Sequence, residues 1–426
     1  MHARCCAQRA WSMNLPPGRS SGGGGKKPRL RIAVVQLGMP LQSHVRDLIN
    51  GLIAQNCSVD LLTSVDDFAG FIDRGTIAGG VESIGTGGRV GNLYRKIRSR
   101  LAIATGIPIT IHPWFVRKGA DRFFAERERY DVLIGVEKGG LELASRQGLR
   151  TRVPVVYYSL ELYIEGHPGW YRFGWQRRSE IRCHRLAAAT MIQDQLRWKC
   201  LRLANRPGSD KVYFLPVGTP EAQDPGTSIG QPSLPQTACG KMTLLYLGLI
   251  GDSRFSGELI RIGRSLPENL VMHLHGPLAN PASESSTARN PSPRVRVSTN
   301  LLSESAMLRL VAQADIGLAL YRRDIANDRL TAYSSHKIAL YLQAGKPIIA
   351  FRSETYEDLM SRFECGELID SIDELGAATE RIQLGYGAYA TEARKAFLSI
   401  YKLDNYWIDL ASFLSRLATE AETNTA

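Results

Sequence analysis

The sequence alternates short runs of β-branched residues with segments of helical periodicity, and it does so twice along the chain. This alternation is typical of parallel α/β sheets with helices on both faces. The strands expected in the first half cover residues 32–37, 59–63, 132–136, 155–158, 190–193 and 212–215. Those expected in the second half cover residues 243–247, 271–274, 295–297, 316–320 and 348–351. We therefore predict two α/β domains of similar architecture.

Chain length and local composition predict where these domains begin and end. A chain of 426 residues suits two domains of about 150 to 200 residues each. Residues 219–240 are rich in Pro, Gly, Ser, Thr and Gln and lack a hydrophobic period, which is typical of a linker. We expect a disordered leader over residues 1–29, an N-terminal domain over 30–218, a C-terminal domain over 241–400 and a closing helix over 401–426.

Composition excludes several classes of protein. The apolar fraction of 44% and the charged fraction of 22% are typical of a globular chain, not of a disordered chain or a membrane bundle. The sequence contains no run of about 18 apolar residues, which is the length that a membrane-spanning helix needs. The seven cysteines are scattered and include no two-residue-spaced pair, so neither a disulfide framework nor a structural zinc site is expected. The cytoplasm is the expected location.

The formal net charge of +12 predicts an anionic partner without identifying it. The basic residues show no nucleic-acid-binding motif, so nucleic acid is not an expected partner. Over residues 89–129, Lys and Arg are interleaved with Trp114, Phe115, Phe123 and Phe124. This stretch is either a surface that docks on an anionic membrane or acceptor, or a solvated basic face whose aromatic residues belong to the core.

The strongest single segment is residues 334–350, which read SSHKIALYLQAGKPIIA. It predicts a helix that is capped by serine, ends at Gly345 and leads directly into a buried strand. The start of such a helix presents free backbone N–H groups and the positive end of its dipole, and Lys337 adds a cation. The segment therefore predicts a diphosphate site at Ser334, Ser335 and Lys337. The alternative is an ordinary capped helix.

The C-terminal half, over about residues 243–365, resembles the family 4 glycosyltransferases (GT-B type) and related bacterial branches in the order and spacing of such motifs. The resemblance implies two Rossmann-like domains that face a cleft. A nucleoside-diphosphate sugar would bind the C-terminal domain, and a glycan or lipid-linked acceptor would bind the N-terminal domain. The donor-binding residues that it implies are Gly248, Arg254, His275, Gly276, Ser334, Ser335 and Lys337.

The N-terminal half resembles the family less closely, but it contains candidate acceptor-side residues. Glu161 belongs to a Glu-Leu-Tyr sequence that resembles a turn of the family. It is either an active-site carboxylate or a carboxylate of a turn or helix start. Glu137 follows an expected strand where many members carry a catalytic-site histidine, so the resemblance suggests that it orients the acceptor hydroxyl. Gly38 lies in the loop after the first expected strand, at the sheet edge where ligands bind. The predicted catalytic residues are thus Glu137 and Glu161, with Gly38 on the acceptor side.

Two positions depart from the family pattern. Many members carry two glutamates that contact the transferred sugar and the ribose, and here these places hold Ala332 and Leu340. The ribose contact is therefore unassigned. The resemblance implies a retaining reaction in polysaccharide or envelope glycan synthesis. Arg254 and Lys337 would stabilise the leaving diphosphate in place of a divalent cation, because no Asp-x-Asp motif is present. No metal or other cofactor is expected.

Two other functions remain open at this stage. A non-hydrolysing sugar-nucleotide epimerase shares the expected fold but needs acid–base carboxylates and histidines around the sugar, and these are sparse. A non-catalytic sugar or nucleotide binding module would tolerate the missing glutamates. His273 and His275 share one face of an expected strand and could ligate a metal, but the sequence offers no third ligand.

Overall fold

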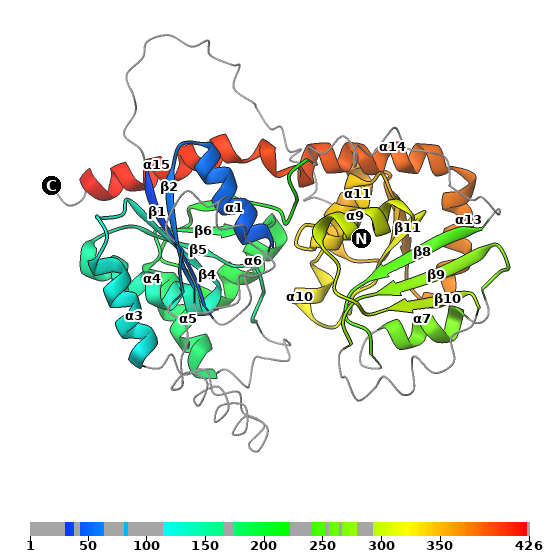
Figure 1. The fold of residues 1–426 in the computed structure, drawn as a ribbon, viewed down its shortest axis with the longest axis horizontal. Coiled ribbons are helices and arrows are strands. Elements are labelled where there is room, and N and C mark those ends of the chain that lie inside the picture. The colour runs from blue at the N-terminus through cyan, green and yellow to red at the C-terminus, as the bar shows by residue number, and fades with distance from the viewer. Residues whose placement is uncertain are drawn as a thin grey trace, which may run out of the picture.

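The computed structural model describes residues 30–37, 43–63, 81–83, 114–164, 174–221, 241–251, 255–263, 266–278 and 293–423. The described residues form two α/β bodies that lie side by side, each built on one parallel sheet (Figure 1). Helices cover both faces of each sheet. This arrangement confirms the two α/β domains that the sequence predicts.

The first body holds one sheet of seven strands among the described residues, in the order β3-β2-β1-β4-β5-β6-β7. Its elements are β1 (Arg31–Gln36), α1 (Ser43–Ala54), β2 (Ser58–Thr63), β3 (Val81–Ser83), α3 (Trp114–Ala125), β4 (Val132–Val136), α4 (Glu137–Thr151), β5 (Val155–Tyr158), α5 (Gly174–Leu186), β6 (Ala189–Ile192), α6 (Gln195–Asn205) and β7 (Val212–Phe214).

The second body holds one sheet of six strands within the described ranges, in the order β10-β9-β8-β11-β12-β13. Its strands are β8 (Met242–Leu247), β9 (Leu270–His275), β10 (Val295–Ser298), β11 (Ile316–Ala319), β12 (Ile348–Phe351) and β13 (Gly366–Ile369). Its helices are α7 (Phe255–Gly263), α9 (Glu304–Ala312), α10 (Ala326–Arg329), α11 (His336–Gln343), α12 (Glu354–Arg362), α13 (Leu375–Leu384) and α14 (Tyr386–Ala396), and the chain ends with α15 (Trp407–Thr423).

The sequence pattern misses two strands, β3 and β13. Both lie at an outer edge of their sheet. β13 reads GELI, and only Ile369 is fully buried, so the strand lacks the continuous apolar run by which the inner strands are recognised. β3 has three residues, too few to show a period. The inner strands lie within about one residue of their expected ends.

Alternating side chains of each inner strand build two cores, one on each face of the sheet. In β1, Ile32 and Val34 pack on the face covered by α1, whereas Ala33 and Val35 pack on the face covered by α3 and α4. The period of two follows from the pleat of a strand. The C-terminal sheet is likewise covered on both faces. Each sheet is therefore buried between two helical layers, as parallel sheets require.

The last helix returns to the N-terminal body. Trp407 and Leu410 of α15 belong to the core formed by α1 and the first sheet. Thr219 forms a parallel bridge with Lys402, so the two chain passages between the bodies run side by side (Figure 1). Among the described residues, no helix has both the length and the apolar character needed to cross a bilayer.

The contact between α1 and α15 gives a stability prediction. A Cβ atom added at Gly51 would lie 2.3 Å from the indole of Trp407. Glycine to alanine normally stabilises a helix interior by about 1 kcal/mol, but we expect Gly51→Ala to destabilise by about 1 to 3 kcal/mol because it overpacks this contact. Urea denaturation followed by circular dichroism measures the change. Gly387→Ala in α14, where the added methyl meets nothing within 4 Å, is the control and should not destabilise. A stabilised Gly51→Ala variant would contradict the packing described.

Candidate functional site

The two sheets reverse their strand order at equivalent places, between β1 and β4 and between β8 and β11. In open parallel sheets, ligands bind outside the carboxyl ends of the strands at this reversal. A cleft of about 1090 Å³ opens there in the C-terminal body. Its lining comes from the ends of β8 and β11, from the starts of α9 and α11, and from Ser43 and Arg46 of α1 in the N-terminal body. Both bodies therefore contribute to the cleft.

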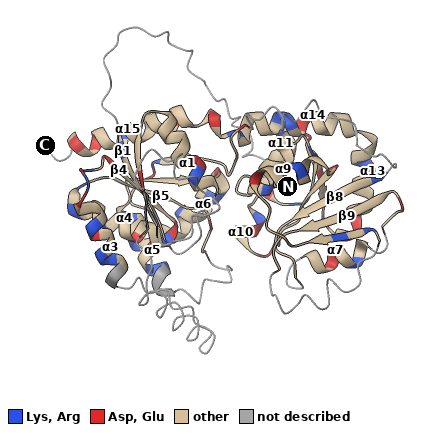
Figure 2. Cartoon of the chain, viewed as in Figure 1, with Lys and Arg blue, Asp and Glu red and all other residues tan. Residues whose placement is uncertain are grey.

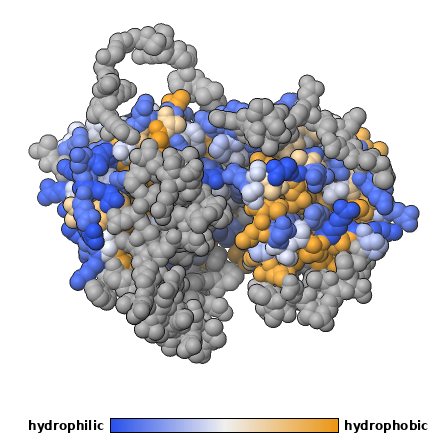
Figure 3. Space-filling model, viewed as in Figure 1, coloured by the Kyte–Doolittle hydropathy of each residue, from blue (hydrophilic) through white to orange (hydrophobic). Residues whose placement is uncertain are grey.

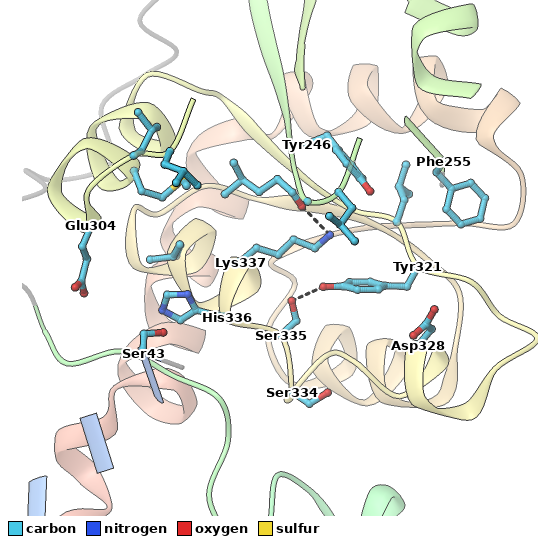
Figure 4. Close-up of a pocket in the computed structure, with 18 of the residues that line it drawn as sticks. Ser43, Tyr246, Phe255, Glu304, Tyr321, Asp328, Ser334, Ser335, His336 and Lys337 are labelled. Atoms are coloured by element: carbon cyan, nitrogen blue, oxygen red, sulfur yellow. Dashed lines mark hydrogen bonds between the residues drawn. The ribbon is translucent and has the colours of Figure 1, made fainter. Parts of the chain in front are cut away.

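Lys337 is the cation at the centre of the cleft (Figure 4). Its Nζ atom donates a hydrogen bond to the carbonyl oxygen of Leu247 over 3.1 Å, at the carboxyl end of β8. The same atom lies 4.1 Å from the ring centre of Tyr321 and 5.0 Å from that of Tyr246. A backbone acceptor and two aromatic faces thus hold the ammonium group in place. A fixed cation beside a helix start suits an anionic ligand.

The start of α11 lies beside Lys337. Ser335 is the N-cap residue, as expected, but its hydroxyl does not cap the helix. Instead, Ser335 Oγ is 2.5 Å from the hydroxyl of Tyr321 (Figure 4), and Ser334 Oγ donates to the carbonyl oxygen of Leu330. The expected side-chain cap is therefore wrong, since both hydroxyls bond to the loop that precedes the helix. The helix ends as predicted, with Gly345 in the left-handed region at a φ of 63°.

The cleft walls are largely apolar. Leu247, Leu302, Met307 and Leu340 line the cleft. Leu301 at its mouth is 91% exposed. Figure 3 shows apolar surface gathered on the visible face of the C-terminal body. Cations and hydroxyls at one end and apolar side chains along the walls match the composition of a site for a small organic anion.

One ion pair crosses the cleft mouth. Arg46 of α1 donates to Glu304 at the start of α9 over 2.9 Å, and it also contacts Asp47. His44 and His336 lie at the starts of α1 and α11, and burial lowers the pKa of both; that of His44 falls to about 3. Because their imidazoles are neutral near pH 7, the positive charge of the described lining comes from Lys337, Arg46 and Arg322.

No family model matches the sequence, and no curated protein matches it at a significant level. Solved structures do match. The Anabaena protein HepE, solved in complex with UDP, is 14% identical with a TM-score of 0.66, over 91% of this chain and 100% of HepE. Sucrose-phosphate synthase from Thermosynechococcus elongatus is 15% identical with a TM-score of 0.66, over 92% of this chain and 100% of the synthase.

WaaG, a glycosyltransferase involved in lipopolysaccharide biosynthesis, is 15% identical with a TM-score of 0.55, over 91% of this chain and 98% of WaaG. The chain has the GT-B fold. This likeness confirms the two facing Rossmann-like domains expected from the sequence. The two bodies are its N-terminal and C-terminal domains.

The GT-B cleft contains some of the expected donor-binding residues, whereas others lie behind it. Gly248, Ser334, Ser335 and Lys337 line the cleft. Gly276 lies behind Gly248: a Cβ atom on Gly276 would meet the carbonyl oxygen of Gly248 at 2.0 Å, so this glycine lets the two turns approach each other. Both glycines adopt a positive φ, of 153° and 151°. Arg254 and Gly38 lie outside the described residues.

His275 is buried and bonds within the C-terminal domain. Its Nδ1 atom is 2.8 Å from Ser298 Oγ, and Nε2 of His273 lies 2.8 Å from the same oxygen. Burial lowers the pKa of both imidazoles. The described residues contain no group of three His, Cys, Asp or Glu side chains that could hold a metal. The two histidines thus hydrogen-bond to a shared serine hydroxyl that joins β9 to β10.

Glu137 and Glu161 lie next to each other, at the seam between the domains and outside the described cleft lining. Oε1 of Glu137 accepts hydrogen bonds from the backbone N–H groups of Leu160 and Glu161, at 2.7 and 2.9 Å. Glu161 Oε2 accepts from Nδ2 of Asn327, which belongs to the C-terminal domain. The structure therefore brings the two predicted carboxylates together and connects one of them to the other domain.

Glu137 combines strain with burial. Its φ of 56° is in the left-handed region, which is unfavourable for a residue with a side chain. Oε2 of Glu137 is buried and has no hydrogen-bond partner among the described residues. Burial, together with the nearby charge of Glu161, raises the pKa of Glu137 to about 8. Strained backbone and a buried, unsatisfied carboxyl are features that cluster at functional sites.

Several residues at the cleft and at the contact between the domains were not predicted from the sequence. Tyr246 and Tyr321, whose rings flank Lys337, end or follow strands β8 and β11. Position at the carboxyl edge of a predicted strand was a signal for both. Arg197 and Asn327 connect the domains through hydrogen bonds. No local pattern marked that pair, because the two residues are 130 positions apart.

The raised pKa of Glu137 predicts a pH dependence of stability. In the folded protein the carboxyl keeps its proton up to a pKa of about 8, whereas the ordinary value is 4.5. The stability that this raised pKa contributes is fully present below pH 4.5, and it is lost as the pH rises through about 8. Each unit of difference corresponds to about 1.4 kcal/mol. Between about pH 5 and pH 8, the wild type should lose more free energy of unfolding than Glu137→Gln, by a difference on the order of a few kcal/mol.

Urea denaturation of both proteins at each pH measures this difference. The glutamine retains an oxygen that accepts from Leu160 and Glu161, so it removes the titration without removing the acceptor. Comparing the two pH slopes cancels the contributions of other titrating groups. Equal slopes in wild type and variant would mean that Glu137 ionises near its ordinary pKa.

Proposed function

We propose that this protein is a glycosyltransferase that moves a sugar from a nucleoside-diphosphate donor in the cleft to an acceptor on the N-terminal domain. The observation that carries the proposal is the ammonium group of Lys337, held between Leu247, Tyr246 and Tyr321 beside the start of α11. Three structures of HepE, which shares the fold, were solved with UDP, with UDP and glucose, and with UDP-glucose. A nucleoside diphosphate is therefore the proposed ligand.

The chemistry of glycosyl transfer suits these residues. As the bond between the sugar and the diphosphate breaks, negative charge develops on the leaving phosphate oxygens. Fixed positive groups lower the barrier because they need no reorganisation while that charge forms. Lys337 and the N–H groups at the start of α11 would supply this stabilisation, together with Arg254.

The proposal includes a metal-independent reaction, in which these groups replace a divalent cation. We also propose that the reaction retains the anomeric configuration and serves bacterial polysaccharide or envelope glycan synthesis. The resemblance to the family 4 glycosyltransferases supports both points. The acceptor would be a glycan or a lipid-linked glycan. Glu137 and Glu161 would orient its hydroxyl group, since they lie at the carboxyl ends of β4 and β5, on the side of the N-terminal domain that faces the other domain.

Donor binding is tested by calorimetric titration of UDP in the presence of EDTA. We expect the wild type to bind, and Lys337→Met to weaken binding about 10- to 100-fold, since a charge-assisted bond to a phosphate contributes about 1.5 to 3 kcal/mol. Methionine keeps the apolar stem and removes only the ammonium group. Arg254→Ala should also weaken binding.

Lys395→Ala is the matched control, because Lys395 is an exposed lysine of α14 that pairs with Glu392 in the same domain, away from the cleft lining. It should bind UDP as the wild type does. Equal affinity in the wild type and in Lys337→Met would rule out the proposed diphosphate site. Binding that depends on added Mg²⁺ would contradict the metal-independent part of the proposal.

We propose that the N-terminal domain docks on an anionic membrane surface, which would bring a lipid-linked acceptor to the cleft. Much of the basic stretch, residues 89–113, lies outside the described residues. Phe123 and Phe124 of α3 pack in the core, so these two aromatic side chains are not available to a membrane. On α5, Arg178, Arg182 and Arg185 are exposed at helical spacing. Figure 2 shows Lys and Arg residues in the region of α3 and α5. Each cation near an anionic leaflet contributes about 1 kcal/mol.

Liposome flotation at low and high salt tests this docking. The wild type should float with anionic vesicles at low salt, remain in the soluble fraction at high salt, and ignore neutral vesicles. Changing Arg95, Lys96, Arg98 and Arg100 together to Ser should reduce flotation, and changing the three α5 arginines to Ser should do so independently. A wild type that stays soluble with anionic vesicles at low salt would exclude membrane docking and leave a soluble acceptor.

A further inference from the structure

Arg197 is a charged side chain buried in the contact between the domains. It lies on α6 of the N-terminal domain and is 1% exposed. Its Nη1 atom donates to the carbonyl oxygens of Asn327 and Leu330, at 3.3 and 3.1 Å, both in the C-terminal domain. Its Nη2 atom donates to the carbonyl oxygen of Leu160 at 2.6 Å and to Oδ1 of Asn327 at 3.2 Å. One guanidinium group thus ties three chain segments together.

Asn327 completes the connection from the other domain. Its Oδ1 atom accepts from the backbone N–H of Leu162 at 2.7 Å, and its Nδ2 atom donates to Oε2 of Glu161 at 2.5 Å. Every one of these partners belongs to the N-terminal domain. The backbone N–H groups of Leu160 and Glu161 donate to the carboxyl group of Glu137. A continuous chain of hydrogen bonds therefore runs from Glu137 through Glu161 to Asn327 of α10.

The segment that carries Asn327 also lines the cleft. Asp328 follows Asn327 directly, and Ser334 and Tyr321 lie at either end of the same connection between β11 and α11. Leu330 of this connection is buried in the core of the N-terminal domain. Movement of this segment relative to Arg197 would therefore move the cleft wall relative to Glu137.

This contact combines the buried side chain of Leu330 with polar groups, and the polar groups suit a contact that opens. A guanidinium group and an amide remain satisfied by water when they separate, whereas a permanent interface buries mainly apolar side chains. Figure 1 shows α10 facing the N-terminal domain, apart from the side where the two chain passages at Thr219 and Lys402 cross. If the domains rotated about these two adjacent chain passages, the residues that lie away from the passages, such as those of α10, would separate first.

We propose that Arg197 and Asn327 form a latch that holds the two domains in the docked arrangement and so positions Glu137 and Glu161 against the donor cleft. Both are positioning residues, since neither lines the described cleft. Their catalytic consequence rests on the proposed glycosyltransferase function. The docking of one domain on the other does not rest on that function, because it is a property of the protein without any ligand.

Single-molecule energy transfer in the full-length protein tests the latch. Bio-orthogonal amino acids at Leu203 of α6 and Leu384 of α13, which are 71% and 91% exposed, carry the two dyes without involving the native cysteines. We expect one high-transfer population in the wild type. Asn327→Ala should reduce the ratio of docked to undocked molecules about tenfold or more, since it removes hydrogen bonds to a charged group and to a carboxylate.

Two further variants separate the latch from a folding defect. Arg197→Met removes the hydrogen bond to Asn327 Oδ1 from the other side, so the double variant should be less open than the sum of the two single effects predicts. Glu354→Ala breaks the ion pair between Arg329 and Glu354, which lies near Asn327 but within the C-terminal domain, and should match the wild type. Unchanged circular dichroism and melting temperature in Asn327→Ala would show that both domains remain folded.

The outcomes separate the latch from the proposed function. An energy-transfer distribution in folded Asn327→Ala that equals the wild-type distribution would overturn the latch, whatever the protein binds. A shifted distribution with unchanged UDP affinity supports the latch and places it outside the donor site. Failure of the wild type to bind UDP counts against the proposed function alone, because the energy-transfer result decides the latch without any ligand.

Discussion

Parallel pairing in both sheets is the constraint on which the rest of this structure depends. Because every strand of a parallel sheet points the same way, all the loops that follow the strands gather at one edge. Strand order reverses between β1 and β4 and between β8 and β11, so each domain has one place where neighbouring loops diverge and leave a crevice. Leu247 and Tyr321 reach the cleft for this reason, and Glu137 reaches the seam by the same geometry.

Positive charge and backbone geometry converge at the C-terminal reversal. The carbonyl oxygen at the end of β8 accepts from Lys337, and the tyrosine rings at the ends of β8 and β11 flank the ammonium group. The free N–H groups of α11 lie beside it. On the N-terminal side, burial and the nearby charge of Glu161 raise the pKa of Glu137, so this carboxyl keeps its proton over a wider pH range than an exposed glutamate does. One domain thus presents a cation and the other a pair of carboxyl groups.

The contact between the domains links these two halves. The same connection between β11 and α11 lines the cleft, buries Leu330 in the opposite core and carries Asn327 to Arg197. Trp407 of α15 packs in the core of the N-terminal domain, so the last helix of the described chain helps to stabilise that domain. The domains are therefore coupled by the side-chain contacts of Arg197 with Asn327 and of Arg46 with Glu304, and also by two chain passages.

The sequence by itself determined the inner strands, the division into two α/β domains and the helix that follows Ser335, because these depend on local periodicity and on residues close in the chain. The GT-B arrangement of the two domains was implied by the resemblance to a known family. It missed the edge strands β3 and β13, whose short or half-exposed runs carry little pattern. Only the tertiary structure decided that Tyr321 takes the Ser335 hydroxyl away from the helix, that His275 bonds to Ser298, and that Arg197 meets Asn327. Such contacts join residues far apart in the chain, and the packing of whole elements, which local propensity does not encode, sets which of them meet.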